Sequence, residues 1–187
     1  MQIVLASQSP RRQELLGLLK KPFQIRVAYI DETIDPAKAP CDEVARLSCG
    51  KAVAIPHAPD ELVIAADTIV VCDGKVLGKP HSAQEARQML SLLSGRAHQV
   101  MTGVTVLLGE RLISHTEVTD VHFRTLSQRE IDTYVESGEP MDKAGAYGIQ
   151  GGAALFVEGI AGDYYNVVGL PVCRLQQMLK EMAPELF

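Results

Sequence analysis

The sequence predicts an α/β fold with a mixed sheet and flanking helices. Apolar runs of strand length alternate with segments of helical periodicity along the chain. Tight turns at Asp73-Gly74 and Gly109-Glu110 join two pairs of runs, which is typical of antiparallel hairpins. Strands separated by helices favour parallel pairing, so we expect both kinds in one sheet. The 187 residues suit one domain, or one domain folded as two lobes around a cleft.

The expected strands are apolar and rich in β-branched residues, as strand interiors are. They lie at residues 3–6, 23–28, 62–72, 75–77, 98–108 and 111–123.

The first two helices are predicted from their starts. Ser9 is a capping residue, and Pro10 suits the first helical position because its missing N–H would have no partner there. Asp42 is expected to cap the second helix, which Pro56 ends.

Three further helices follow. Ser82 with Glu85, and Ser127 with Glu130, have the spacing of a capping box, in which each side chain bonds the other's backbone N–H. The last helix opens at Pro171 and has its apolar side chains on one face.

Glycine is concentrated in one segment. Seven of the 15 glycines fall within residues 138–162. Such a segment is neither all helix nor all strand, because glycine weakens both. It is either a flexible loop or a place where backbone closely approaches a ligand.

Composition excludes several classes of protein. A net charge of −5, with 5% aromatic residues and no tryptophan, disfavours nucleic-acid binding. The four cysteines form no C-x-x-C pair, and the five histidines show no metal-ligand spacing. The first residues do not show the pattern of a signal peptide, and no apolar run reaches the length of a membrane span. We therefore expect a reduced, soluble, cytoplasmic protein without a membrane partner.

Arg11 and Arg12 stand where cations are unfavourable. With Ser9 as the cap they occupy the second and third helical positions, where the helix dipole is positive. A bound anion would reverse that sign, because free backbone N–H groups and both guanidinium groups would meet its oxygens. The hydroxyls of Ser7 and Ser9 add donors; the alternative is a solvated arginine pair.

Asp67 is the only charged residue between Leu62 and Cys72. A carboxylate in such a run is costly unless it is paired, metal-bound or at a strand end that faces a cleft. It either breaks the strand there or has a function, namely to hold a divalent metal, to deprotonate a water, or both. Lys51 and Lys79 do not fit the P-loop spacing, which disfavours a P-loop NTPase.

Together these residues resemble the Maf (septum-formation-inhibitor-like) nucleotide pyrophosphatases. The matching segments, in order along the chain, are ASQSPRRQELL (6–16), ADTIV (66–70), LGKP (77–80), LSGRAHQVMTGV (93–104), DKAGAYGIQG (142–151) and NVVGLP (166–171). The resemblance implies that residues 1–187 form a single Maf-like domain. It also implies a fold like that of the inosine triphosphatases, with two lobes around a nucleotide-binding cleft.

The resemblance implies hydrolysis of a nucleoside triphosphate between its α- and β-phosphates. It assigns catalysis to Asp67, Glu32, Lys51 and Lys79, with Asp67 as the proton acceptor. It places Mg²⁺ or Mn²⁺ at Glu32 and Asp67, whose hard oxygens suit these ions. Substrate binding is assigned to Ser7, Arg11, Arg12, Thr68 and Gln150.

The segment at residues 142–150 resembles the dTTP/UTP branch of the family. The Gln150 amide can both donate and accept, which matches the imide edge of uracil or thymine. The expected substrates are dTTP, UTP and modified pyrimidine forms, as in nucleotide house-cleaning. One alternative is a pyrophosphatase acting on 7-methyl-GTP or another modified purine triphosphate. Another is a non-catalytic nucleotide-binding regulator of cell division. The expected partner is a small-molecule nucleotide, and assembly as a homodimer stays open.

Overall fold

A seven-stranded mixed sheet runs through the computed structural model, which describes residues 1–27 and 29–186. The strand order is β2-β1-β3-β5-β6-β7, with β4 paired to β3. The strands are β1 (Gln2–Leu5), β2 (Phe23–Ile25), β3 (Glu61–Cys72), β4 (Lys75–Leu77), β5 (Ala97–Leu108), β6 (Arg111–Phe123) and β7 (Val157–Ala161). Strand β1 is parallel to β2 and β3, whereas β4 and β7 pair antiparallel with β3 and β6. The predicted α/β class with a mixed sheet and flanking helices is confirmed.

Six α-helices and four short 3₁₀ helices are present among the described residues. The α-helices are α1 (Pro10–Gly17), α2 (Pro40–Val53), α3 (Ala83–Leu93), α4 (Gln128–Glu136), α5 (Tyr164–Val168) and α6 (Val172–Met182). The 3₁₀ helices are η1 (Glu139–Asp142), η2 (Ala144–Ala146), η3 (Gly152–Leu155) and η4 (Pro184–Leu186). None of the helices in residues 1–27 and 29–186 combines the length and apolarity needed to span a bilayer.

The chain divides into two compact units. The first contains Met1–Asp67, Thr102–Glu117 and Gly169–Phe187, and the second contains Thr68–Met101 and Val118–Val168. Strands β3, β5 and β6 each contribute residues to both units.

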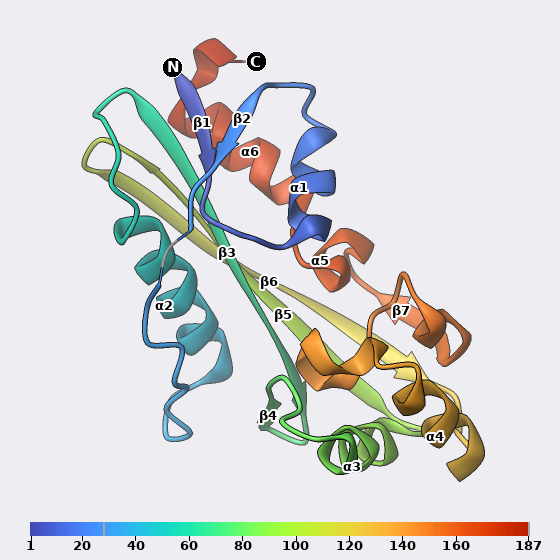
Figure 1. The fold of residues 1–187 in the computed structure, drawn as a ribbon. Coiled ribbons are helices and arrows are strands. Elements are labelled where there is room, and N and C mark those ends of the chain that lie inside the picture. The colour runs from blue at the N-terminus through green and yellow to red at the C-terminus, as the bar shows by residue number, and fades with distance from the viewer. Residues whose placement is uncertain (28, 187) are drawn as a thin grey trace. The chain divides into compact units, whose positions relative to one another are not determined.

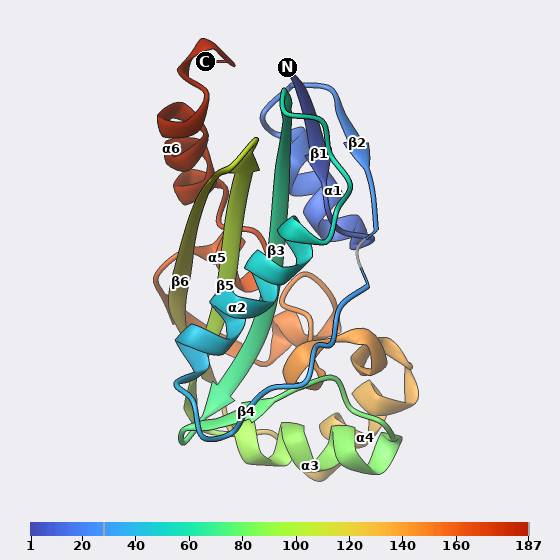
Figure 2. The same ribbon diagram turned by 90° about the vertical axis from the view of Figure 1, so that its left-hand side faces the viewer.

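In the first unit, helices cover both faces of the sheet. Figures 1 and 2 show α2 on one face of β3 and β5, and α1 and α6 on the other. The side chains of β6 alternate accordingly: Thr116 donates to the carbonyl of Cys41 in α2, whereas Glu117 pairs with Arg174 in α6. Between α2 and the sheet lies an apolar cluster of Val4, Ala6, Ala52, Ile55, Val63, Ala65 and Leu107.

Helix α2 approaches strand β5 closely at Gly103. An added Cβ at Gly103 would collide with the carbonyl oxygen of Val44, and it would lie 2.8 Å from the carbonyl carbon. One turn further along α2, the hydroxyls of Ser48 and Thr105 share a hydrogen bond of 2.8 Å. The absence of a side chain at Gly103 therefore sets how near α2 lies to the sheet.

The core of the second unit includes a buried histidine. His98 is 3% exposed and meets Phe123 and Tyr147 edge-on, with centroid distances of 4.9 and 5.3 Å. Its Nε2 and the Tyr147 hydroxyl share a hydrogen bond of 2.7 Å. Burial, aided by the nearby His122, lowers the pKa of His98 to about 4, so the ring is neutral at pH 7.

Most of the predicted elements are present. Strands β1, β3 and β5 and helix α6 begin one residue away from the predicted start, and the bounds of α2 and β2 differ by more. Ser9, Ser82 and Ser127 cap their helices, and Ser127 and Glu130 form the full capping box. Asp42 is not a cap: α2 begins earlier, after Ala39, and ends at Val53. Proline at its first position starts that helix without a side-chain cap.

The strand predicted at residues 23–28 is shorter, since β2 ends at Ile25; Ala28 lies outside the described residues. Strand β7, helix α5 and the 3₁₀ helices were not predicted. Each has at most five residues, so they carry little periodic signal.

We expect Gly103→Ala to lower the free energy of unfolding by about 2 kcal/mol, because the new methyl group forces the α2 backbone away from β5. Urea unfolding measures this change. Gly17→Ala is the control, because a Cβ at this helical position meets nothing within 4 Å; it should leave stability unchanged or raise it. Equal stability of Gly103→Ala and wild type would contradict the close approach.

We expect the unfolding free energy to fall by about 2 kcal/mol between pH 7 and pH 5 because of His98 alone. An unfolded histidine takes up a proton below its ordinary pKa of about 6.5, whereas folded His98 stays neutral down to a pKa of about 4. The contribution of neutral His98 to the free energy of unfolding is therefore complete above the unfolded pKa of about 6.5, and it is lost as the pH falls towards the folded pKa of about 4. Urea unfolding of His98→Gln at both pH values should show a smaller loss than wild type; an equal loss would contradict the assignment.

Candidate active site

The first part of the site is the N-terminus of α1. Ser9 caps the helix by accepting from the backbone N–H of Arg12 at 3.4 Å, which places Arg11 and Arg12 at the predicted second and third positions. The Ser7 side chain is buried, and its Oγ accepts from the Ser9 N–H at 3.2 Å. Both hydroxyls keep a hydrogen to donate, as an anion site requires.

The Arg12 guanidinium is held in place by two acceptors. Nε donates to the carbonyl of Gly169 at 2.8 Å, and Nη1 donates to Ser7 Oγ at 3.4 Å. Burial lowers the pKa of Arg12, and the negative charge of Asp67 opposes that shift most strongly. Arg12 is therefore a fixed cation inside the first unit, electrostatically coupled to Arg11, Glu32 and Asp67.

The second part is an ammonium group shared by two carboxylates. Lys51, in the last turn of α2, pairs with Asp67 on β3, and its Nζ lies 2.9 Å from Oε1 of Glu32. Lys51 and Asp67 are nearly buried, with 12% and 13% of their side chains exposed, whereas Glu32 is 55% exposed. Strand β3 continues through Asp67, so the strand break considered above is wrong, and ion pairing offsets the cost of the carboxylate.

Six of the nine predicted site residues thus belong to the first unit: Ser7, Arg11, Arg12, Glu32, Lys51 and Asp67. These six residues include three cations and two carboxylates, so together they carry a net positive charge, which suits an anion.

The remaining three predicted site residues, Thr68, Lys79 and Gln150, lie in the second unit. Thr68 is half-buried on β3, and Lys79 and Gln150 are exposed. The Lys79 segment is fixed to the glycine-rich segment, since Gly145 donates its N–H to the carbonyl of Gly78 at 3.0 Å.

The glycine-rich segment is packed on its own side chains. The Glu139 carboxylate accepts from the Tyr134 hydroxyl at 2.9 Å and from the Gly152 N–H at 3.0 Å. The Tyr134 hydroxyl in turn accepts from the Gly148 N–H at 3.2 Å. A Cβ at Gly151 would collide with Glu139.

The sequence suggested two explanations for the glycines, a flexible loop or the close approach of a ligand. These contacts give a third: the glycines leave room for the side chains of Glu139 and Tyr134. Glu139 and Tyr134 shape the loop that carries Gln150, and sequence reasoning did not find them. The glycines three residues apart were the available signal.

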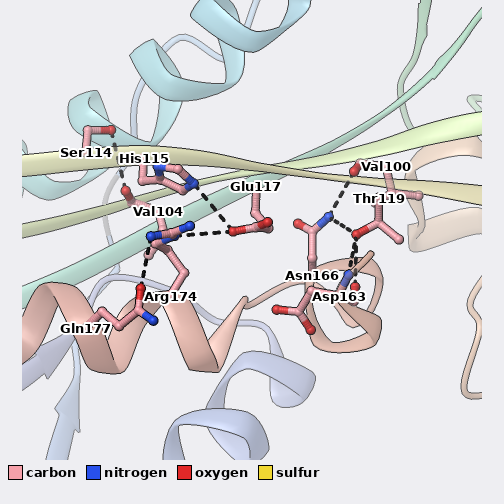
Figure 3. Close-up of polar contacts among 10 residues, drawn as sticks. All are labelled: Val100, Val104, Ser114, His115, Glu117, Thr119, Asp163, Asn166, Arg174 and Gln177. Atoms are coloured by element: carbon pink, nitrogen blue, oxygen red, sulfur yellow. Dashed lines mark hydrogen bonds and ion pairs between the residues drawn. The ribbon is translucent and has the colours of Figure 1, made fainter. Parts of the chain in front are cut away.

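Gly169 was also missed as a site residue. It follows α5, whose Asn166 is fully buried and donates through Nδ2 to the Val100 carbonyl at 3.0 Å and to Thr119 Oγ1 at 2.9 Å (Figure 3). Asp163 donates its N–H to Thr119 Oγ1 at 3.0 Å and closes the network. Helix α5 is thus anchored in the second unit immediately before Gly169, which begins the next stretch of the first unit.

The residues present fit a divalent cation held jointly with phosphate. Within residues 1–27 and 29–186, no three His, Cys, Asp or Glu side chains gather into a metal cage. Mg²⁺ is commonly bound by one or two carboxylates, water and substrate phosphates, without such a cage. Glu32 and Asp67 supply two carboxylates that already converge on one positive charge, that of Lys51.

Comparison with known proteins agrees with the motif pattern. The family described as "Maf-like protein" matches residues 2–182. A dTTP/UTP pyrophosphatase of Symbiobacterium thermophilum is 53% identical over 188 residues, covering 100% of this chain and 96% of that protein. A dTTP/UTP pyrophosphatase of Bacillus cereus is 50% identical over 180 residues, covering 96% and 94%.

Among solved structures, a HAM1 protein from Coxiella burnetii is similar with a TM-score of 0.48 and 15% identity, over 97% of this chain and 99% of that chain.

Proposed function

Since the chain belongs to the Maf family, we propose that it is a nucleoside triphosphate pyrophosphatase. It hydrolyses dTTP and UTP to the monophosphate and pyrophosphate, the activity named for relatives about 50% identical to it. The observation that carries the proposal is the cluster of Arg12, Glu32, Lys51 and Asp67 inside one compact unit.

Asp67 is the proton acceptor of the proposed reaction. Its carboxylate takes a proton from the attacking water, whose oxygen forms a bond to the α-phosphorus. The bond from that phosphorus to the bridging oxygen breaks, and pyrophosphate leaves with the electron pair. Lys51 orients the Asp67 carboxylate through their ion pair.

The cations stabilise the charge that develops on the departing pyrophosphate. Arg11 and Arg12 present guanidinium groups at the start of α1, where the helix dipole is positive, and Lys51 adds an ammonium. We propose that Lys79 of the second unit adds a further cation.

Glu32 and Asp67 would hold the divalent cation, Mg²⁺ or Mn²⁺, which neutralises charge on phosphate oxygens when it is bound.

The base is selected in the second unit. Gln150 is exposed on the loop that Glu139 and Tyr134 shape, so its amide is available to pair with an imide edge. Thr68 is the second proposed substrate-binding residue there. Modified pyrimidine triphosphates share the same edge and belong to the proposed substrate range.

Residues 1–187 are proposed to act as a single Maf-like domain with a nucleotide-binding cleft. The family match runs from residue 2 to residue 182, across the residues of both units. A cytoplasmic location is also proposed, since the four cysteines do not show the spacing of a disulfide framework. Whether the protein forms a homodimer is decided by its molar mass in solution, which light scattering measures.

We expect the purified protein with Mg²⁺ or Mn²⁺ to release pyrophosphate from dTTP and UTP and little from purine triphosphates. Pyrophosphate and orthophosphate are measured separately, because orthophosphate alone would mean attack at the γ-phosphate and would contradict the mechanism. Pyrophosphate from 7-methyl-GTP instead would keep the chemistry and overturn the role of Gln150. No release from any nucleotide would favour a binding protein.

We expect Asp67→Asn to reduce kcat by about 10³-fold, in line with the 10²–10⁴-fold that a positioned base contributes. The fold should persist, because Lys51 keeps Glu32 as a partner; circular dichroism checks this. Asp60→Asn, an exposed carboxylate just before β3, is the control and should retain the wild-type rate. A wild-type rate for Asp67→Asn would show that Asp67 is not the base.

A further inference from the structure

Glu32 lies on a segment without regular secondary structure. Residues 29–39 form no helix or strand, and the Glu32 side chain is 55% exposed. Its carboxylate nevertheless lies 2.9 Å from Lys51 Nζ. An exposed side chain on an irregular segment loses such a position readily, because ordering it costs conformational entropy. Something else must fix the backbone beside Glu32.

Helix α2 holds the backbone on the C-terminal side of Glu32 at two points. Arg46 Nη2 donates to the carbonyl of Thr33 at 2.7 Å. The Glu43 carboxylate accepts from the backbone N–H of Asp35 at 2.9 Å. Two backbone groups just after Glu32, those of Thr33 and Asp35, are therefore hydrogen-bonded to α2.

The same helix contacts the segment on the N-terminal side of Glu32. A Cβ added at Gly50 would lie 3.2 Å from Ile30 Cδ1, so the isoleucine side chain packs against that glycine. Glu43, Arg46 and Gly50 are three and four residues apart, which places them on one face of α2. Lys51 follows Gly50 directly, so α2 positions both Lys51 and the segment that brings Glu32 to it.

Glu43 and Arg46 form the central pair of this face. The carboxylate of Glu43 is buried, with 1% exposed, and accepts from Arg46 Nε at 3.1 Å and Nη2 at 2.9 Å. These bonds, with that from the Asp35 N–H, lower the pKa of Glu43 to about 2. A two-pronged pair of this kind fixes both side chains in one geometry.

We propose that Glu43 and Arg46 are positioning residues that hold Glu32 in place and thereby set the affinity of the site for its divalent cation. Neither residue needs to touch the cation or the nucleotide. The inference rests on the proposed function, because it matters only if Glu32 is a metal ligand.

The test measures Mn²⁺ binding directly. Free Mn²⁺ is followed by electron paramagnetic resonance as protein is added in the presence of α,β-methylene-dTTP, which cannot be split at the reacting bond. Glu43→Gln should weaken Mn²⁺ binding by about 10-fold, as loss of a residue that orients a ligand commonly does. With dTTP, the KM for the metal should rise similarly, while kcat at saturating metal stays within about 2-fold of wild type.

Glu61→Gln is the matched control. Glu61 also accepts two bonds from one arginine, at 2.7 and 2.5 Å from Arg26, and one from a backbone N–H, at 2.8 Å from Ala58. It lies six residues before Asp67 on β3, about 20 Å away along an extended strand. Glu61→Gln should lose stability much as Glu43→Gln does, yet it should bind Mn²⁺ like wild type.

Two further variants separate failure of this inference from failure of the proposed function. Glu32→Gln should weaken Mn²⁺ binding at least as much as Glu43→Gln. If Glu32→Gln weakens it and Glu43→Gln does not, the positioning role is wrong and the metal role of Glu32 stands. If Glu32→Gln binds normally, the metal assignment is wrong and the inference is overturned with it. Should Glu43→Gln not fold, Arg46→Lys replaces it, because lysine keeps the charge but cannot bond both Glu43 and Thr33 in the same geometry.

Discussion

The candidate site depends on the pairing of the Lys51 ammonium with two carboxylates, those of Asp67 and Glu32. Asp67 is a carboxylate in an apolar strand, which is tolerated because Lys51 neutralises it. The same ammonium brings in Glu32 from an irregular segment. Three elements distant in sequence therefore meet at one nitrogen atom, and a divalent cation with substrate phosphates can use the same two carboxylates.

The rest of the first unit serves to place that nitrogen. Gly103 lets α2 lie close to β5, and the Ser48–Thr105 hydrogen bond fixes the helix along the strand. One face of α2 then holds the segment around Glu32, and its last turn carries Lys51. On the other face of the sheet, α1 presents Arg12, which the Gly169 carbonyl holds in position. The packing of the first unit and the geometry of the candidate site thus depend on the same contacts.

The second unit uses a comparable design for a different purpose. Its glycine-rich segment is shaped by Glu139 and Tyr134, and its core places a neutral His98 against Tyr147 of the same segment. In the proposed reaction this unit reads the base through Gln150, whereas the first unit handles the phosphates and the metal. The contacts that shape the loop of Gln150 are therefore separate from those that place Lys51, Glu32 and Asp67.

The sequence by itself determined the α/β class, three of the helix caps, the cationic start of α1 and the unusual carboxylate at Asp67. These are local properties, set by period, by capping chemistry and by the cost of charge in an apolar run. Glu32 was identified only through the family resemblance, because nothing local distinguishes it from its acidic neighbour Asp31. Only the tertiary structure decided that Glu32 meets Lys51. It also decided that Glu43 and Arg46 bond the backbone of Asp35 and Thr33, just after Glu32. Those contacts depend on how α2 packs on the sheet, which no local pattern encodes.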